Sequence, residues 1–151
     1  MFVTNVASSF LVLCRLAVAF PHPSVPQANS DILIIRASEE VNPNAVTDTT
    51  CLNLDAAIDF HDQNVATLSI CGGIQGATEK CGGAPTSTTG QSGTAKFTLN
   101  PTVAGATINV SKGRWEGCIR AARAVCPTGS FKSVCKGGAS EGDIAFTLDN
   151  P

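Results

Sequence analysis

Hydrophobic and polar residues alternate along several short segments of this chain. In LNLDAAIDFH, residues 52–61, apolar side chains fall on nearly every second position, and ATLSIC repeats the pattern soon after HDQN. Because successive side chains of a strand point to opposite faces, the alternation predicts strands with one buried and one solvated face. The two segments therefore predict an antiparallel hairpin that turns at residues 61–64.

The same alternation predicts further strands in TAKFTLNP, ATINVS and DIAFTL, and DILIIRAS near Asp31 fits a first strand. GAPTSTTGQSGT, residues 83–94, has no such pattern and is predicted to be a polar loop. Short strands separated by Gly, Pro, Asn and Asp indicate an all-β domain, a small antiparallel β-barrel or sandwich. The inward-facing residues predicted for it are Ala95, Phe97, Leu99, Ala106, Ile108, Val110, Ile144, Phe146 and Leu148.

The segment WEGCIRAARAVC, residues 115–126, fits neither period cleanly. Its alanines and arginines are strong helix formers, so propensity favours one short helix here. A strand stays open as the alternative.

The first thirty residues predict export. An apolar run ends in AVAF, and Ala17 and Ala19 match the small residues that precede a signal-peptide cleavage site. The run is interrupted by Arg15 and is shorter than the ~20 apolar residues that a membrane-spanning helix needs. We therefore expect a signal peptide at 1–19, a Pro-rich leader at 20–30 and a single secreted, extracellular domain at 31–151.

Removing the signal peptide takes Cys14 away and leaves an even number of cysteines, which in a small secreted domain predicts disulfide bonds. The spacings suit neither a structural zinc site nor a Cys-x-x-Cys redox pair. Loop closure favours the local pairs Cys71–Cys81 and Cys126–Cys135, which leaves Cys51 with Cys118.

Charge is unevenly distributed around a formal net value of −2. Acidic residues dominate 20–79, and basic residues dominate 80–151, above all between Lys112 and Lys136. In an exported chain this basic segment predicts an acidic protein or polysaccharide partner rather than nucleic acid or a membrane, unless it is an ordinary solvated face. The expected contact residues are Arg114, Trp115, Arg120 and Arg123.

Residues for catalysis are sparse. His22 and His61 have no neighbouring nucleophile in a recognisable motif, and Asp55 and Asp59 fall on a predicted solvated face. We expect no catalytic residue, no metal site and no cofactor, hence no enzyme. Asn109 opens an Asn-Val-Ser sequence, a glycosylation acceptor in a eukaryotic secretory route.

Three stretches, AAIDFHDQNVATLSIC, KCGGAP…GTAKFTLN and VCPTGSFKSVCKGGASEGDIAFTL, resemble the fungal secreted allergen and elicitor family typified by the major Alternaria allergen. The resemblance implies a β-barrel with disulfides Cys71–Cys81 and Cys126–Cys135, with Cys51 and Cys118 as additions. It also favours a strand at 115–126. The family's cysteine ahead of the first strand has no counterpart between Phe20 and Asp31, which implies a monomer or a non-covalent dimer.

The family consists of non-enzymatic secreted factors that act as allergens, as elicitors, or as binders of host defence proteins such as thaumatin-like ones, with some linked to flavonoids. The resemblance thus implies a fungal effector whose partner is a host extracellular protein or a small phenolic ligand. The alternative function is a killer-toxin-like antimicrobial or channel-blocking protein, whose folds mix helices with a sheet. A small hydrolase or carbohydrate binder is a third hypothesis, for which the sequence offers no site.

Overall fold

A computed structural model describes residues 40–74, 81 and 83–151. The predicted signal peptide, the Pro-rich leader and the strand expected at Asp31 lie outside the described residues.

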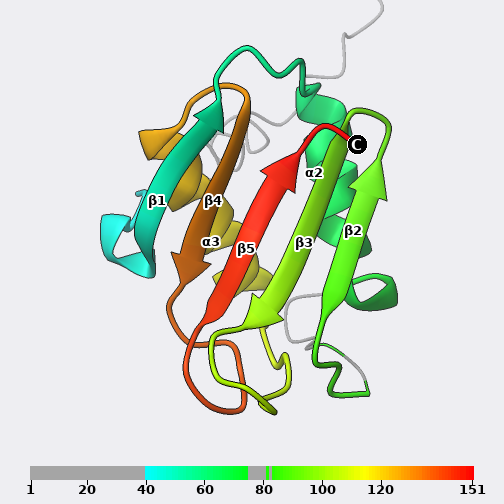
Figure 1. The fold of residues 1–151 in the computed structure, drawn as a ribbon, viewed down its shortest axis with the longest axis vertical. Coiled ribbons are helices and arrows are strands. Elements are labelled where there is room, and N and C mark those ends of the chain that lie inside the picture. Colours follow the sequence, from blue (N-terminus) through cyan, green and yellow to red (C-terminus); the bar gives the residue numbers. More distant parts are fainter. Residues whose placement is uncertain (1–39, 75–80, 82) are drawn as a thin grey trace, which may run out of the picture. The chain divides into compact units, whose positions relative to one another are not determined.

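Five antiparallel strands form one sheet (Figure 1): β1 (Val46–Asn53), β2 (Thr88–Ser92), β3 (Ala95–Pro101), β4 (Ser130–Cys135) and β5 (Ile144–Asp149). Their order is β1-β4-β5-β3-β2, so β5 is central and β1 and β2 are the edges. The prediction of an antiparallel β domain stapled by disulfides is confirmed. Because its two edge strands do not pair with each other, the sheet is open rather than closed into a barrel.

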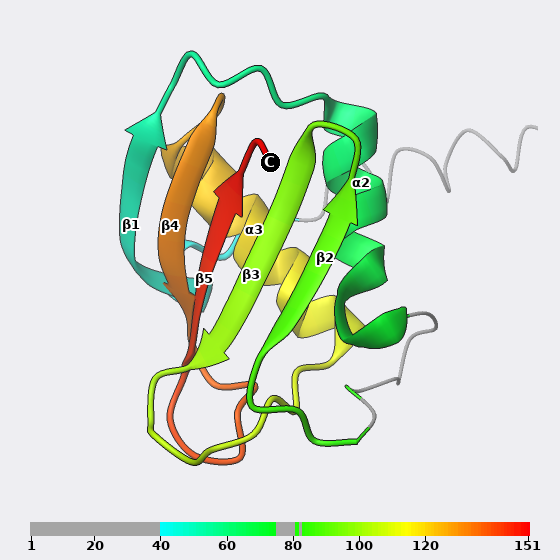
Figure 2. The ribbon, with the colours of Figure 1, turned by 45° about the vertical axis from the view of Figure 1, so that its right-hand side comes forward.

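Two helices, α2 (Phe60–Ser69) and α3 (Lys112–Val125), cover one face of the sheet, as Figure 2 shows. The core lies between the two layers. Trp115 of α3 is fully buried and packs edge-on against Phe97 and Phe146, with ring centroids 5.2 and 5.0 Å apart. Its indole Nε1 donates a hydrogen bond to the Thr67 carbonyl of α2 over 3.0 Å. One side chain thus joins both helices to the sheet.

The ambiguous segment at 115–126 is helical, as its residue propensities predicted, because α3 covers all of it except Cys126. Ser111 caps the first turn, since its Oγ accepts from the backbone N–H of Arg114. The buried residues then recur at helical spacing: Trp115, Cys118, Ile119, Ala121 and Ala122. The strand that the family resemblance implied for this segment is wrong.

The predicted hairpin at 52–70 is wrong, because α2 occupies its second half. Asp59 caps this helix by accepting from the backbone N–H groups of His61 and Asp62. The side chains buried beneath α2 include two polar ones, Gln63 and Thr67. The hydroxyl of Thr67 is satisfied by the Gln63 carbonyl, at 2.7 Å. The sequence pattern placed Gln63 in the turn of the hairpin and Thr67 on a solvated strand face, and so it suggested the wrong period.

Strands β3 and β5 confirm two of the predicted strands. Three further strands were missed. β1 overlaps the strand predicted at 52–61 only at its last two residues, β2 lies inside the predicted loop at 83–94, and β4 lies in the loop that the expected Cys126–Cys135 bond would close. Ala106, Ile108 and Val110 are buried as predicted, but their segment is not one of the five strands; Ile108 makes an isolated bridge to Ala139.

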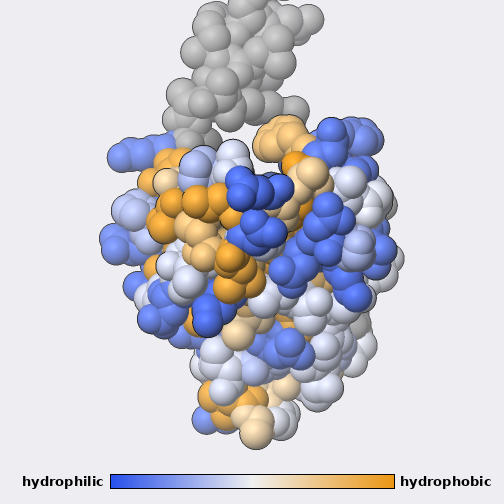
Figure 3. Space-filling model, turned by 45° about the horizontal axis from the view of Figure 1, so that its top comes forward, coloured by the Kyte–Doolittle hydropathy of each residue, from blue (hydrophilic) through white to orange (hydrophobic). Residues whose placement is uncertain are grey.

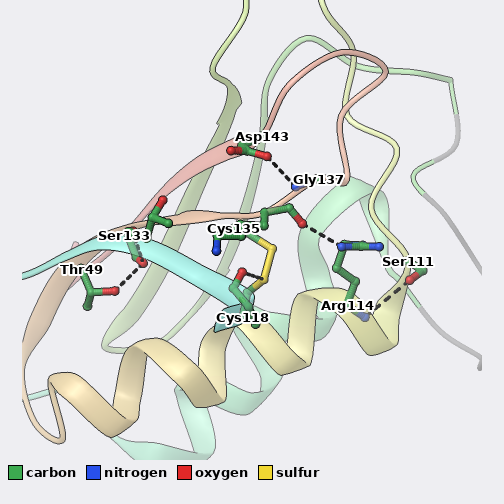
Figure 4. The surroundings of a disulfide bond; sticks show 11 residues. Thr49, Ser111, Arg114, Cys118, Ser133, Cys135, Gly137 and Asp143 are labelled. Atoms are coloured by element: carbon green, nitrogen blue, oxygen red, sulfur yellow. Dashed lines mark hydrogen bonds between the residues drawn. A yellow bond between two sulfur atoms is a disulfide. The ribbon is translucent and has the colours of Figure 1, made fainter. Parts of the chain in front are cut away.

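Of the expected disulfides, Cys71–Cys81 is confirmed and the other two are wrong. The observed bonds are Cys118–Cys135, shown in Figure 4, and Cys51–Cys126. Cys126 follows the end of α3, whereas Cys135 lies at the far end of β4. The six residues of β4 alone extend over about 17–20 Å, and a disulfide requires Cα atoms less than about 7 Å apart. The short sequence separation therefore did not decide the pairing.

Asp62 fixes the first turn of α2 to the turn between β2 and β3. Its Oδ2 accepts hydrogen bonds from the backbone N–H of Thr94 at 2.8 Å and from the Thr94 hydroxyl at 2.9 Å, and its Oδ1 accepts one from Ser92. These bonds, with a smaller contribution from the His61 charge, hold the pKa of Asp62 below its ordinary value of 3.8.

We expect Asp62→Asn to lower stability only where the carboxylate is ionised. Because the pKa is lowered in the folded state, its stabilisation is present above pH 3.8 and is lost as the pH falls through the folded-state pKa. Denaturant midpoints of parent and variant should therefore differ at neutral pH and converge in acid. Thr94→Ala, which keeps the backbone donor, should show a smaller difference. An equal gap at every pH would contradict this role.

Candidate functional site

The structure separates the four residues expected to form a contact surface. Trp115 has no exposed surface, so the prediction that it contacts a partner is wrong. Arg114 is exposed in the first turn of α3, where its Nη1 donates to the Lys136 carbonyl at 2.7 Å (Figure 4). Arg120 and Arg123 line one groove, which makes this groove the candidate site.

The groove, called the helix groove here, runs between α2 and α3 and has a volume of about 390 Å³. Its base contains the buried side chains Gln63, Thr67 and Ile119. The remaining lining residues are more exposed: Phe60, Asn64 and Leu68 from α2, and Glu116, Arg120 and Arg123 from α3. Lys112 pairs with Glu116 at 3.5 Å on the α3 side.

A second depression, the end hollow, adjoins the helix groove and shares Phe60, Gln63 and Arg123 with it. The hollow has a volume of about 420 Å³. Its other walls are the connection between β1 and α2 and the turn that follows α3, comprising Ala56, Ala57, Ile58, Pro127, Thr128 and Gly129. The Cys51–Cys126 disulfide links β1 to the C-cap residue of α3, just before these two segments begin.

Large apolar side chains are exposed around these depressions. Phe60, shared by both, is 74% exposed, and Leu54 and Val125 on the adjoining segments are 55% and 57% exposed. Figure 3 shows apolar patches interspersed with polar ones when this end of the molecule is turned forward. Exposed aromatic rings next to pockets are typical of protein-binding surfaces.

Arg123 holds the wall between groove and hollow in place. Its Nε donates to Gln63 Oε1 at 2.7 Å, and its Nη1 donates to the carbonyls of Gly129 and Cys126 at 2.9 and 3.2 Å. The guanidinium also lies 4.9 Å from the ring centroid of Phe131. Burial lowers the pKa of Arg123, but an arginine remains charged in proteins. Its contacts therefore give Arg123 a structural role in the site.

Comparisons with protein-family models, curated proteins and solved structures find no match for this chain. The resemblance to the fungal allergen family stays a prediction. Among the described residues, no helix is both long and apolar enough to cross a membrane. The described part of the chain also has no group of three or more His, Cys, Asp or Glu side chains arranged to hold a metal ion.

Sequence reasoning missed Phe60 as a surface residue because alternation placed it on the buried face of a strand. The sequence does contain a helix-start signal that would have placed Phe60 on a helix. Asp59 is an N-cap residue, and Asp62 is an acidic residue in the first turn. Asn109 is exposed, as a glycosylation acceptor must be, and its use remains a prediction.

We expect Arg123→Ala to lower the free energy of unfolding by about 2–3 kcal/mol, because three hydrogen bonds to a charged group are lost. Arg123→Lys should recover only part of this, since an ammonium cannot reproduce the planar fork. Lys112→Ala, which breaks a partly exposed pair on the same helix, should cost less than about 1 kcal/mol. Equal losses in Arg123→Ala and Lys112→Ala, measured by urea unfolding, would exclude this structural role.

Proposed function

We propose that this chain is a secreted effector-type protein that binds a host extracellular protein through the helix groove and the end hollow. The supporting observation is Phe60, a 74% exposed aromatic ring at the junction of two depressions. An exposed aromatic side chain between pockets supplies a large contact area at a low cost in conformational entropy.

The disulfides support extracellular action. Such bonds persist in oxidising compartments and reinforce small domains. Two of them connect α3 to strands β1 and β4, so the helix that forms one wall of the groove is fixed before a partner arrives. A preformed surface loses less conformational entropy on binding than a flexible one does. The fungal origin and the plant-defence partner follow from the family resemblance and are part of the proposal.

The test begins with the purified exported chain, immobilised and exposed to plant apoplastic fluid, and with identification of the proteins it retains. The purified partner is then titrated calorimetrically against parent and variants. Phe60→Ala should weaken binding about tenfold or more, the effect expected of a central aromatic contact.

Val65→Ala is the matched control. Val65 is an exposed apolar residue of the same helix that does not line the helix groove. The proposal fails if no retained protein binds saturably, or if Phe60→Ala and Val65→Ala bind it as tightly as the parent does.

The arrangement of helices favours a second candidate, a killer-toxin-like antimicrobial or channel-blocking protein. Two helices on one face of an antiparallel sheet are the mixed architecture expected of that class, and a barrel is not. If this candidate is correct, the purified protein should inhibit the growth of susceptible fungal cells in a dose-dependent way, and disulfide reduction should abolish the effect. Undiminished growth across a panel of species would count against it.

A further inference from the structure

The face of the sheet opposite the helices carries its own depression, the sheet hollow, with a volume of about 310 Å³. This face of the sheet is turned toward the viewer in Figure 1, and the residues that line the hollow come from the four adjacent strands β1, β4, β5 and β3. The lining residues are Asp48, Thr98, Asn100, Lys132, Ser133, Val134, Ala145, Phe146 and Thr147. The sheet hollow is separate from the helix groove, because the whole thickness of the sheet and its core lies between them.

Strand register explains why a depression forms here. On the central strand β5, Ala145 lies opposite Val134 of β4 and Asn100 of β3, and Thr147 lies opposite Lys132 and Thr98. The side chains of this face alternate with the buried ones of the core, such as Phe146. A short alanine side chain at the middle of the sheet leaves a low apolar floor between longer neighbours.

Asp48 reaches this hollow from an irregularity in the edge strand. The register of β1 against β4 shifts between Thr47 and Thr50, and Asp48 there has a positive φ of 54°. Such backbone is disfavoured for residues other than glycine. Bulges of this kind frequently redirect a side chain beside a binding site.

The buried hydroxyl of Ser133 holds the irregularity in place from both sides of Asp48. Ser133 Oγ donates to the Thr47 carbonyl at 3.2 Å and lies 2.7 Å from the Thr49 hydroxyl (Figure 4). The backbone that carries the Asp48 carboxylate is therefore positioned by hydrogen bonds before any ligand binds.

The side chains around the sheet hollow include one acidic and one basic group, and they offer both hydrogen-bond donors and acceptors. Asp48 supplies a carboxylate acceptor, Lys132 an ammonium donor and Asn100 an amide that does both. One acid and one base leave no net charge, so an anionic or cationic ligand would meet a like charge as well as an opposite one. Hydroxyl groups can donate to Asp48 and accept from Lys132, while a C–H face packs on Ala145 and Val134.

We propose that the sheet hollow binds one pyranose unit of a neutral polysaccharide. A ring with hydroxyls at its edge and C–H groups on its face matches polar groups around an apolar floor. The volume of about 310 Å³ lies at the lower end of the ~300–1,000 Å³ range of small-molecule sites, as expected for a site that holds a single sugar unit. This site does not depend on the partner surface proposed above, and both faces can be occupied together.

The test uses ¹⁵N-labelled exported chain and four probes: the trisaccharides of β-1,3-linked glucose, β-1,4-linked glucose and β-1,4-linked N-acetylglucosamine, and glucuronic acid as the charged comparison. We expect at least one neutral trisaccharide to shift the backbone amide signals of Lys132, Val134, Ala145 and Thr147 saturably. Glucuronic acid should bind more weakly. If no neutral probe shifts these amides, or if glucuronic acid binds most tightly, the proposal is overturned.

Two variants locate the site. Asp48→Gly removes the carboxylate while suiting the positive φ, so the variant should melt no lower than the parent and bind the sugar about tenfold more weakly. Ala145→Val keeps a good strand former and fills the floor, so it should abolish binding. Asp149→Asn, on β5 but outside the hollow, should bind as the parent does.

Unchanged affinity in both Asp48→Gly and Ala145→Val would overturn the assignment to this hollow. The fluorescence of Trp115, the single tryptophan and a buried one, reports whether each variant is folded. Phe60→Ala should retain sugar binding in full, so failure of the partner surface and failure of the sugar site remain distinguishable.

Discussion

Two disulfide bonds, Cys118–Cys135 and Cys51–Cys126, hold helix α3 against strands β4 and β1. In the first turn of α3, before either cysteine, Trp115 packs into the core against Phe97 and Phe146. Its indole N–H donates a hydrogen bond to the Thr67 carbonyl of α2. A small domain buries a modest fraction of its surface, so covalent links that restrict the unfolded chain contribute substantially to its stability. The helix groove and the end hollow are both lined in part by α3, and the sheet hollow lies on the sheet to which α3 is bonded.

With both helices on one face, the molecule has two chemically different surfaces. The helix side carries exposed apolar groups, Phe60 foremost, around depressions whose shared wall is held by Arg123. The opposite side is a polar sheet face with the sheet hollow near its middle. Proteins use the first kind of surface to bind other proteins, whereas the second suits a hydroxylated ligand. The two proposed sites therefore lie on opposite faces of the sheet, and a ligand at one leaves the other accessible.

Both edges of the sheet are protected from pairing with other chains. β1 has two register irregularities and a residue with positive φ, features that interrupt a continuous row of backbone hydrogen-bonding groups. β2 is only five residues long, and α2 packs against it so closely at Gly90 that a side chain there would meet the Ala66 carbonyl. The irregularity in β1 thus has two effects. It interrupts the edge strand that another chain could pair with, and it places Asp48 at the sheet hollow.

The sequence predicted those features that depend on local pattern alone. Alternation identified β3 and β5, where buried residues alternate with more exposed ones, and it also assigned the burial of Ala106, Ile108 and Val110 correctly. Helix propensity was right for α3, and the even cysteine count correctly predicted a disulfide framework. Alternation failed at α2 because Gln63 and Thr67 are polar yet buried, and their burial depends on Arg123 and on a backbone carbonyl.

The sequence by itself determined an antiparallel, disulfide-stapled domain, since strand periodicity and cysteine number can be read without knowing what packs against what. Only the tertiary structure decided which cysteines bond, because that depends on where α3 crosses the sheet and not on separation along the chain. The same holds for both candidate sites. Phe60 and Arg123, and likewise Asp48 and Ala145, are far apart in sequence and come together only when the helices pack and the strands align.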